Sequence, residues 1–263
     1  MASPSTSTSF PALPLPRTQT PTTPPISLLP TPLAQTYTHI HPILLLLLSY
    51  LLFPRLVALP ISTLATTLPL LALLQSAYAI ICLPVASKSA ATQKPPATQK
   101  PSKPVGSVRK RPAPSKGNTA LRDLRIKLVP TLLSHLLTLL LGLPSLLALL
   151  ILFGAPLTTH LPHTTLLAAH MSLLSLFPLF YVHGVDRRVW TEVTSAWLAF
   201  DEVWGATVGC VLGAWLGAVP IPLDWDREWQ KWPITILTGA YLGHVVGKIV
   251  GGYLLRGKRI SFD

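Results

Sequence analysis

Four ionisable side chains lie in or beside apolar segments near the end of the chain. Asp201 and Glu202 open one apolar segment, and His244 and Lys248 lie within the next. A charge at the centre of a membrane span costs about 2.5–3.5 kcal/mol on insertion scales, so such groups usually face other helices and pair. These residue types fit a site for a phosphate-bearing lipid headgroup or a proton relay. They also fit an ion pair that only fixes the register of two helices, because intramembrane polar pairs often serve packing.

Glycines recur at every fourth position in the same two segments, and this spacing places each set along one side of a helix. The first row is Gly205, Gly209, Gly213 and Gly217, and the second is Gly239, Gly243, Gly247 and Gly251. In lipid, a row of small residues lets two backbones approach closely. The two rows, joined by a short loop, predict a tightly closed helical hairpin. If the hairpin is antiparallel, a carboxylate of Asp201 or Glu202 comes close to Lys248.

The composition indicates a polytopic integral membrane protein. The chain has 263 residues, of which 49% are hydrophobic and only 11% charged, and the apolar residues form long runs. The net charge of +12 does not indicate nucleic acid, because much of it lies in one loop. Eleven of the 21 Lys and Arg residues fall between Lys88 and Lys127, where Asp123 is the single acid. A basic loop between spans marks the cytoplasmic side of a membrane.

The hydropathy pattern predicts an all-α fold with six transmembrane helices and divides the chain into five parts. Residues 1–37 read as a disordered tail rich in Pro, Ser and Thr, and residues 86–122 as a disordered basic cytoplasmic loop. Residues 38–85 hold helices 1 and 2, residues 123–256 hold helices 3 to 6, and residues 257–263 form a tail. The expected spans are about 40–58, 62–85, 128–156, 163–183, 198–219 and 233–255. With the basic loop in the cytoplasm, both termini are cytoplasmic too.

Other candidate groups give weaker signals. His160 and His163 form an HxxH in a short loop, but no Cys or carboxylate lies close in sequence to complete a metal site. Cys82 and Cys210 lie in separate apolar runs, which favours a packing role over a disulfide framework. P-loop and GxSxG motifs are absent from the sequence. We therefore expect no catalytic residue, no cofactor and no metal site.

The stretch GAWLGAVPIPLDWDREWQKWPIT, residues 213–235, closely resembles the PIG-F family of glycosylphosphatidylinositol (GPI) anchor biosynthesis. The resemblance is specific over about the last 70 residues, whereas the earlier spans agree in hydropathy only. The tail and the TQKPPATQKP repeat of the basic loop have no counterpart in this resemblance.

The resemblance implies a multi-pass protein of the endoplasmic reticulum membrane that does not itself catalyse a reaction. It would stabilise PIG-O-like and PIG-G-like transferases, which add ethanolamine phosphate from phosphatidylethanolamine to mannose of the GPI precursor. The glycine rows and the region of Asp201 and Lys248 would then stabilise a bundle that docks on the partner's spans. Asp224, Trp225, Asp226 and Arg227 become candidates for an interface with the partner's lumenal domain. They also fit a turn with interfacial tryptophans.

Two other functions remain open. The chain could be a small phospholipid-handling enzyme that uses His244 and Lys248, or a transporter whose polar strip lines a path for lipid headgroups. In either case a phospholipid or the GPI precursor would touch the polar cluster. The absence of visible inverted repeats argues mildly against a transporter.

Overall fold

The computed structural model describes residues 23–86 and 116–260 of the chain. Residues 1–22 of the predicted tail, residues 87–115 of the basic loop predicted for 86–122, and residues 261–263 lie outside the described residues. The prediction of a disordered loop was wrong for residues 116–122, because helix α4 (Lys116–Leu137) already begins at Lys116. All regular secondary structure within the described ranges is helical, which confirms the all-α prediction for them.

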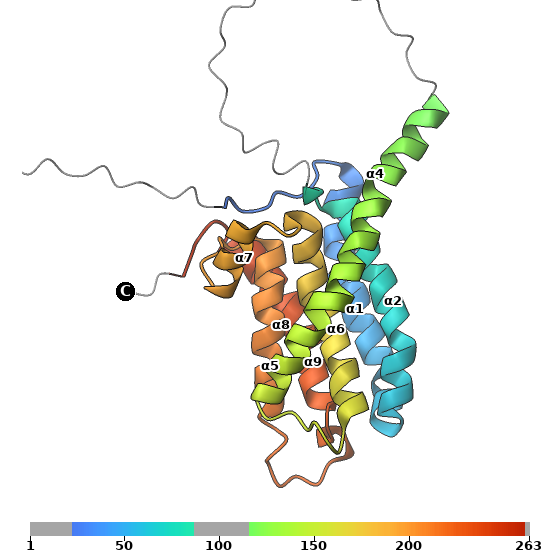
Figure 1. Ribbon diagram of the computed structural model, residues 1–263. Helices are drawn as coiled ribbons and strands as arrows, with labels where there is room; N and C mark the ends of the chain where they lie inside the picture. The colour runs from blue at the N-terminus through green and yellow to red at the C-terminus, as the bar shows by residue number, and fades with distance from the viewer. Residues whose placement is uncertain (1–22, 87–115, 261–263) are drawn as a thin grey trace, which may run out of the picture.

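The helical elements of the described ranges follow one another in a fixed order along the chain. They are α1 (Pro32–Ala58), α2 (Pro60–Cys82), α4 (Lys116–Leu137), η1 (Thr138–Gly142), α5 (Leu143–Leu152), α6 (Leu161–His183), α7 (Arg187–Thr194), α8 (Glu202–Ala218), η2 (Glu228–Gln230), α9 (Ile234–Ile249) and η3 (Val250–Leu254). Helix α4 continues through the π-helical turn η1 into α5, so the three form one long rod (Figure 1).

Within the described residues, five stretches are long and apolar enough to cross a membrane: α1, α2, Arg125–Leu152, α6 and Ile234–Leu254. Helix α8 is apolar but has 17 residues, fewer than the about 20 that usually span the hydrocarbon core. The six predicted spans correspond to these five stretches and α8. The membrane class is thus supported, while a sixth crossing by α8 remains a prediction.

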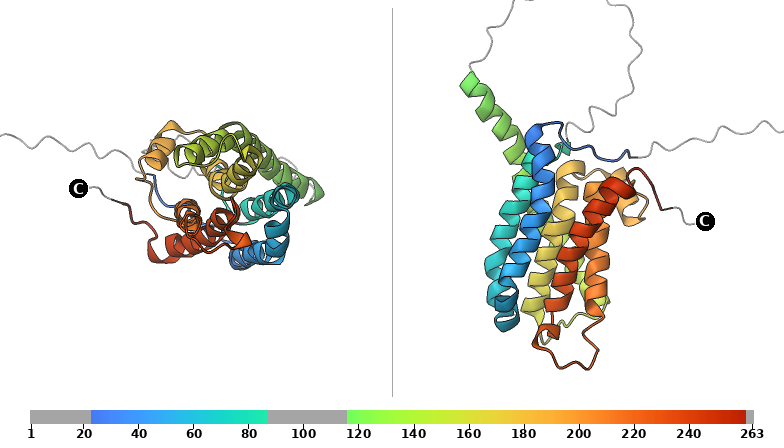
Figure 2. Two further views of the ribbon diagram at one scale, coloured as in Figure 1. Left: turned by 90° about the horizontal axis from the view of Figure 1, so that it is seen from below. Right: turned by 180° about the vertical axis from the view of Figure 1, so that it is seen from behind.

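Helix α6 lies at the centre of the bundle, and 83% of its most apolar stretch is buried. It contacts α2, α4, α5, α8 and α9. Helices α1 and α2 form one side of the bundle, and α8 and α9 form another, with α9 next to α1 (Figure 2). Helix α9 therefore has two neighbours beyond α6: α8 on one face and α1 on the other.

Helix α1 begins earlier than the hydropathy pattern indicates. The Thr31 hydroxyl accepts a hydrogen bond from the Ala34 N–H at 3.2 Å, and Pro32 occupies the first helical turn. A threonine N-cap followed by proline is a strong start signal, because proline at N1 removes an N–H that has no helical partner. Residues 32–37, which we assigned to the tail, therefore belong to the helix.

Residues 23–30, which we call the strap, are extended and cross one end of the bundle (Figure 2). The Leu29 N–H donates to the Cys82 carbonyl at 2.9 Å. At the start of the strap, the Thr23 N–H bonds to the Glu192 carboxylate, and the Arg259 guanidinium donates to the Thr23 carbonyl at 2.8 Å. The strap thus joins α2, α7 and the segment after η3. We call this the strap end of the bundle and the opposite one the loop end.

Candidate functional site

The two glycine rows face each other across the α8–α9 contact. A Cβ added to Gly209 would lie 2.7 Å from the Gly247 Cα, and one added to Gly213 would lie 2.8 Å from the Gly243 Cα. Real Cβ atoms essentially never come this close to a backbone atom. Gly205, Gly217, Gly239, Gly243, Gly247 and Gly251 are similarly confined by backbone atoms of the opposite helix or its flanking residue. The helices thus touch backbone to backbone, and any larger side chain would force them apart.

An apolar groove of about 810 Å³ follows this contact along the outside of the hairpin, and we call it the glycine groove. Both glycine rows contribute to its lining, and its walls are mainly aliphatic. The wall residues on α8, α9 and η3 include Val208, Leu212, Leu216, Leu242, Val246 and Val250. Pro220 and Trp229 line it too, so the groove extends to the loop end.

Asp201 is the N-cap of α8. Its Oδ1 accepts hydrogen bonds from the N–H groups of Val203 and Trp204, both at 2.8 Å. Its Oδ2 accepts from the N–H of Ile26 in the strap, also at 2.8 Å. Three N–H groups therefore hold this carboxylate, which caps the helix and fastens the strap at once.

Glu202, the next residue, is the carboxylate that the fold brings to Lys248. The Lys248 Nζ lies 3.8 Å from the Glu202 Oε2, and both side chains are more than nine-tenths buried. The same oxygen accepts hydrogen bonds from the Thr38 hydroxyl at 2.8 Å and the Tyr78 hydroxyl at 3.2 Å. Lys248 also lies over the Tyr78 ring, 3.9 Å from its centroid. Residues of α1, α2, α8 and α9 thus meet in one polar cluster.

A proline explains how α1 takes part in this cluster. The Lys248 Nζ donates to the Thr38 carbonyl at 3.0 Å. In a regular helix this carbonyl would accept from the N–H four residues later, but that residue is Pro42, which has none. Pro42 therefore leaves an acceptor free inside α1, and the lysine of α9 satisfies it.

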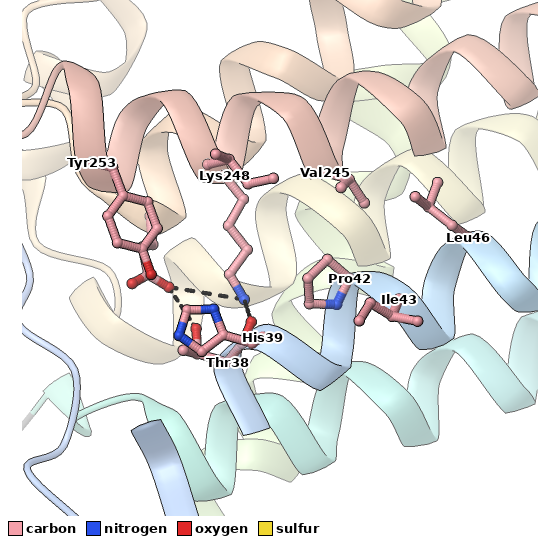
Figure 3. Close-up of a pocket in the computed structure, with 10 residues that line it drawn as sticks. Thr38, His39, Pro42, Ile43, Leu46, Val245, Lys248 and Tyr253 are labelled. Atoms are coloured by element: carbon pink, nitrogen blue, oxygen red, sulfur yellow. Dashed lines mark hydrogen bonds and ion pairs between the residues drawn. The ribbon is translucent and has the colours of Figure 1, made fainter. Parts of the chain in front are cut away.

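A second groove, of about 380 Å³, opens beside this cluster, and we call it the polar groove. Figure 3 shows Lys248 reaching from α9 toward α1, with His39 and Tyr253 near its charged end. The lining residues are Thr38, His39, Pro42, Ile43, Leu46, Glu202, Val245, Lys248, Ile249 and Tyr253. Thr38, His39 and Tyr253 lie toward the strap end, whereas Ile43, Leu46 and Val245 lie deeper in the bundle.

His244, which we grouped with Lys248, lies deeper and is 2% exposed. It is not among the residues that line the polar groove. Its ring is 6.4 Å from that of His41, which stacks on Tyr78 at 4.5 Å between ring centroids. His244 thus belongs to the buried aromatic layer under the cluster.

The predicted interface residues Asp224, Trp225, Asp226 and Arg227 lie in the loop between α8 and α9, at the other end of the bundle from Lys248 (Figure 1). All four are exposed. The Gln230 side chain holds the loop, since its amide donates to the carbonyls of Pro220 and Leu223 at 2.8 and 2.9 Å. The sequence candidates thus form two separate places, a polar cluster and an exposed loop.

The remaining histidines and cysteines form no common centre. The His170 ring lies 3.1 Å from the Thr67 hydroxyl, and the His160 and His163 rings are 5.3 Å apart. Cys82 and Cys210 are buried and free. In the described ranges, no group of three or more His, Cys, Asp or Glu side chains could hold a metal ion.

Sequence reasoning overlooked the residues of α1 and α2 that bond to Glu202 and Lys248 or line the polar groove beside them. Thr38, His39 and Pro42 belong to the sequence THIHP, just before the apolar run of α1, and Tyr78 lies near the end of α2. The available signal was a cluster of polar and aromatic residues beside a proline at the start of a predicted span.

Comparison with known proteins finds relatives of the chain. The profile of "GPI biosynthesis protein family Pig-F" matches residues 40–252. The chain is 47% identical to glycosylphosphatidylinositol anchor biosynthesis protein 11 of Aspergillus fumigatus over 253 residues, which cover 88% of this chain and 83% of that protein. It is 43% identical to the Neurospora crassa protein of the same name over 235 residues, covering 89% of this chain and 80% of the relative.

A third relative has a different architecture. Over 108 residues the chain is 39% identical to a "PIGF/3-ketodihydrosphingosine reductase fusion protein" of Schizosaccharomyces pombe, which covers 40% of this chain and 22% of the fusion. No solved structure matches the chain.

Proposed function

Because the chain belongs to the GPI biosynthesis protein family Pig-F, we propose that it is a non-catalytic subunit of GPI ethanolamine-phosphate transferases in the endoplasmic reticulum membrane. In this role it stabilises PIG-O-like and PIG-G-like catalytic subunits, which transfer ethanolamine phosphate to mannose of the GPI precursor. Family membership supports a part in GPI anchor synthesis, and the α8–α9 hairpin supports the subunit role.

The proposed topology has six spans, with the strap end in the cytoplasm. Arg187 and Arg188 begin α7 at that end, and Arg256 and Arg259 follow η3 there. Lysine and arginine accumulate on the cytoplasmic side of membrane proteins, which supports this orientation. The loop that contains Asp224 and Arg227 then faces the lumen.

The single observation that carries the subunit role is the glycine groove. Its floor is glycine backbone and its walls are aliphatic, so it fits a transmembrane helix of the catalytic subunit better than it fits a polar ligand. Between membrane helices, association depends on close packing, and a groove without floor side chains allows it. We assign the occupant as one apolar helix of the partner.

The position of the exposed loop supports the same assignment. Trp229 lines the glycine groove at the loop end, and its ring lies 5.8 Å from the ring of Trp225. A helix in the groove would therefore emerge beside Trp225 and its neighbours Asp224, Asp226 and Arg227. These residues would then contact the part of the partner that leaves the membrane.

The proposal is tested by filling the glycine groove from its wall. Val246→Trp places a large ring in the groove, while Val211→Trp changes a residue of α8 that lines neither groove. Val246 is 57% exposed and Val211 is 38% exposed, so both proteins should fold. We expect Val246→Trp to lose co-purification of the transferase in mild detergent and to lower ethanolamine-phosphate transfer in cells, and Val211→Trp to retain both.

Two outcomes would overturn the proposal. If Val246→Trp retains the partner as well as Val211→Trp does, the groove does not hold it. If the purified chain alone transfers ethanolamine phosphate, or moves labelled phosphatidylethanolamine across vesicles, the enzyme or transporter alternative replaces the subunit role.

A further inference from the structure

The geometry points to a lipid site in the polar groove, for a phospholipid whose headgroup carries a primary ammonium beyond its phosphate. The ammonium would bind Glu202, the phosphate would lie near Lys248, and an acyl chain would follow the aliphatic wall. This inference does not depend on the proposed subunit role, because it rests on another face of α9.

The bonding of Glu202 leaves one oxygen for a ligand. Thr38, Tyr78 and Lys248 all approach Oε2. No donor in the described parts of the chain bonds to Oε1, and Glu202 lines the groove. An ion pair that served only to join helices would gain from bonding both oxygens, because a buried carboxylate is stabilised by every donor that it can accept from.

The charges of the groove favour a ligand that carries both signs. Glu202 and Lys248 lie side by side, so a lone anion would meet the carboxylate and a lone cation would meet the ammonium. A headgroup with an ammonium and a phosphate can match each charge with its opposite.

An aromatic pair at the groove also favours an ammonium. The His39 and Tyr253 rings stack with their centroids 6.4 Å apart, and both residues line the groove beside Glu202. Aromatic faces attract cations by about 0.5–1 kcal/mol at exposed sites. A primary ammonium can also donate a hydrogen bond to Oε1, which a quaternary ammonium cannot do.

The shape of the groove matches a lipid that lies in the membrane. Thr38 and Tyr253 lie toward the strap end, whereas Leu46 and Val245 lie deeper along α1 and α9. A headgroup and the first part of an acyl chain therefore meet surfaces of their own polarity. The volume of about 380 Å³ is within the usual range for small-molecule sites.

The test measures retention of defined lipids by the full-length chain in nanodiscs, using native mass spectrometry. We expect phosphatidylethanolamine to be retained about tenfold more than phosphatidylglycerol, which has the phosphate but no amine, a difference of about 1.4 kcal/mol. Phosphatidylcholine should bind more weakly than phosphatidylethanolamine. Equal retention of all three lipids would overturn the proposal.

Two variants locate the site. Ile249→Trp fills the polar groove at a residue that is 49% exposed, so the fold should tolerate it, and we expect about a tenfold loss of phosphatidylethanolamine. Val211→Trp is the matched control and should bind like the unchanged protein. Glu202→Gln should abolish the preference for phosphatidylethanolamine over phosphatidylglycerol. If Ile249→Trp binds as the control does, the site is not in this groove, whether or not Glu202→Gln folds.

A competition arm separates a lipid from a free headgroup compound. Soluble phosphoethanolamine should not displace the lipid at equal concentration, because the aliphatic wall contributes to binding. Equally effective displacement would overturn the lipid assignment. The subunit role and the lipid site fail separately, since Ile249→Trp should keep the transferase partner and Val246→Trp should keep the lipid.

Discussion

The two faces of α9 hold their neighbours by opposite means. The face toward α8 carries hydrogen atoms where side chains would be, and steric contact between two backbones sets the distance. The face toward α1 carries Lys248, a long charged side chain that bonds to the Thr38 carbonyl and pairs with Glu202. The first face depends on the absence of side chains. The second depends on one side chain, that of Lys248, and on its bonds to Thr38 and Glu202.

This difference predicts different tolerance to change. The glycine face allows no added atom at many positions, because both sides of the contact are rigid backbone. The lysine face depends on few atoms. Substitutions that remove both members of its ion pair should therefore cause only a small loss of stability. Four sets of substitutions test this contrast, with expected effects that decrease in size.

The largest effect should follow Gly209→Ala, whose Cβ would lie 2.7 Å from the Gly247 Cα. Separating the helices should cost about 3 kcal/mol or more, at the upper end for overpacking. We expect the Tm of the detergent-purified protein, followed by tryptophan fluorescence, to fall by about 6 °C or more. The control is Gly142→Ala, whose Cβ would meet only side-chain atoms, with Leu176 nearest at 3.2 Å. Equal melting of the two variants would contradict steric control of the α8–α9 distance.

Lys248→Met should have the next largest effect, because it leaves the Glu202 carboxylate buried without its counter-charge. Breaking a buried pair usually costs about 3–5 kcal/mol, and we expect about 2 kcal/mol here since Thr38 and Tyr78 still bond to the carboxylate. Thermal unfolding in detergent measures the loss. The double variant Glu202→Gln/Lys248→Met should recover most of it, and no recovery would mean that the two charges are not coupled.

Asp201→Ala removes the N-cap of α8 and the acceptor of the Ile26 N–H. The expected loss is about 1–2 kcal/mol, near the upper range for caps. Hydrogen exchange of residues 23–30 should become faster at the same time. Asp186→Ala is the matched control, since Asp186 caps α7 at an exposed site without touching the strap. A strap that exchanges equally fast in both variants would exclude Asp201 as its anchor.

Pro42→Ala should have the smallest effect on the unchanged protein, below about 1 kcal/mol. The new N–H can bond to the Thr38 carbonyl and so competes with Lys248 for it. The sharper measurement is the cost of Lys248→Met in this background, which should fall by about 0.5–1 kcal/mol, the value of one hydrogen bond. An unchanged cost would show that the free carbonyl does not hold the lysine.

The features that the sequence predicted best are those with a strong periodic signal. The all-helical class followed from long apolar runs, and family membership followed from the motif around Trp225 and Asp226. Spacing by four placed the glycines along helix faces, but it could not show the groove left on the outside of their contact. That groove depends on which large residues flank both rows.

The polar cluster was only partly visible, because its members come from distant parts of the chain. Asp201 and Glu202 are adjacent in sequence, yet one caps a helix and the other meets Lys248. Periodicity cannot separate these two roles. The contribution of α1 arises from a missing N–H at Pro42, which appears in a hydropathy pattern only as a break. We assigned the strap to the disordered tail because its few hydrogen bonds correspond to no periodic pattern in the sequence.

The strap has a consequence for biosynthesis. Arg259 bonds to Thr23 across 236 positions, and Arg256 bonds to Ile26 across 230. During translation, Arg256 and Arg259 are synthesised long after the strap residues to which they bond. The helices from α1 to α9 can therefore pack in order, but these bonds form only after η3 and the segment that follows it have been synthesised. Their formation therefore marks the point at which the segment after η3 lies against the strap.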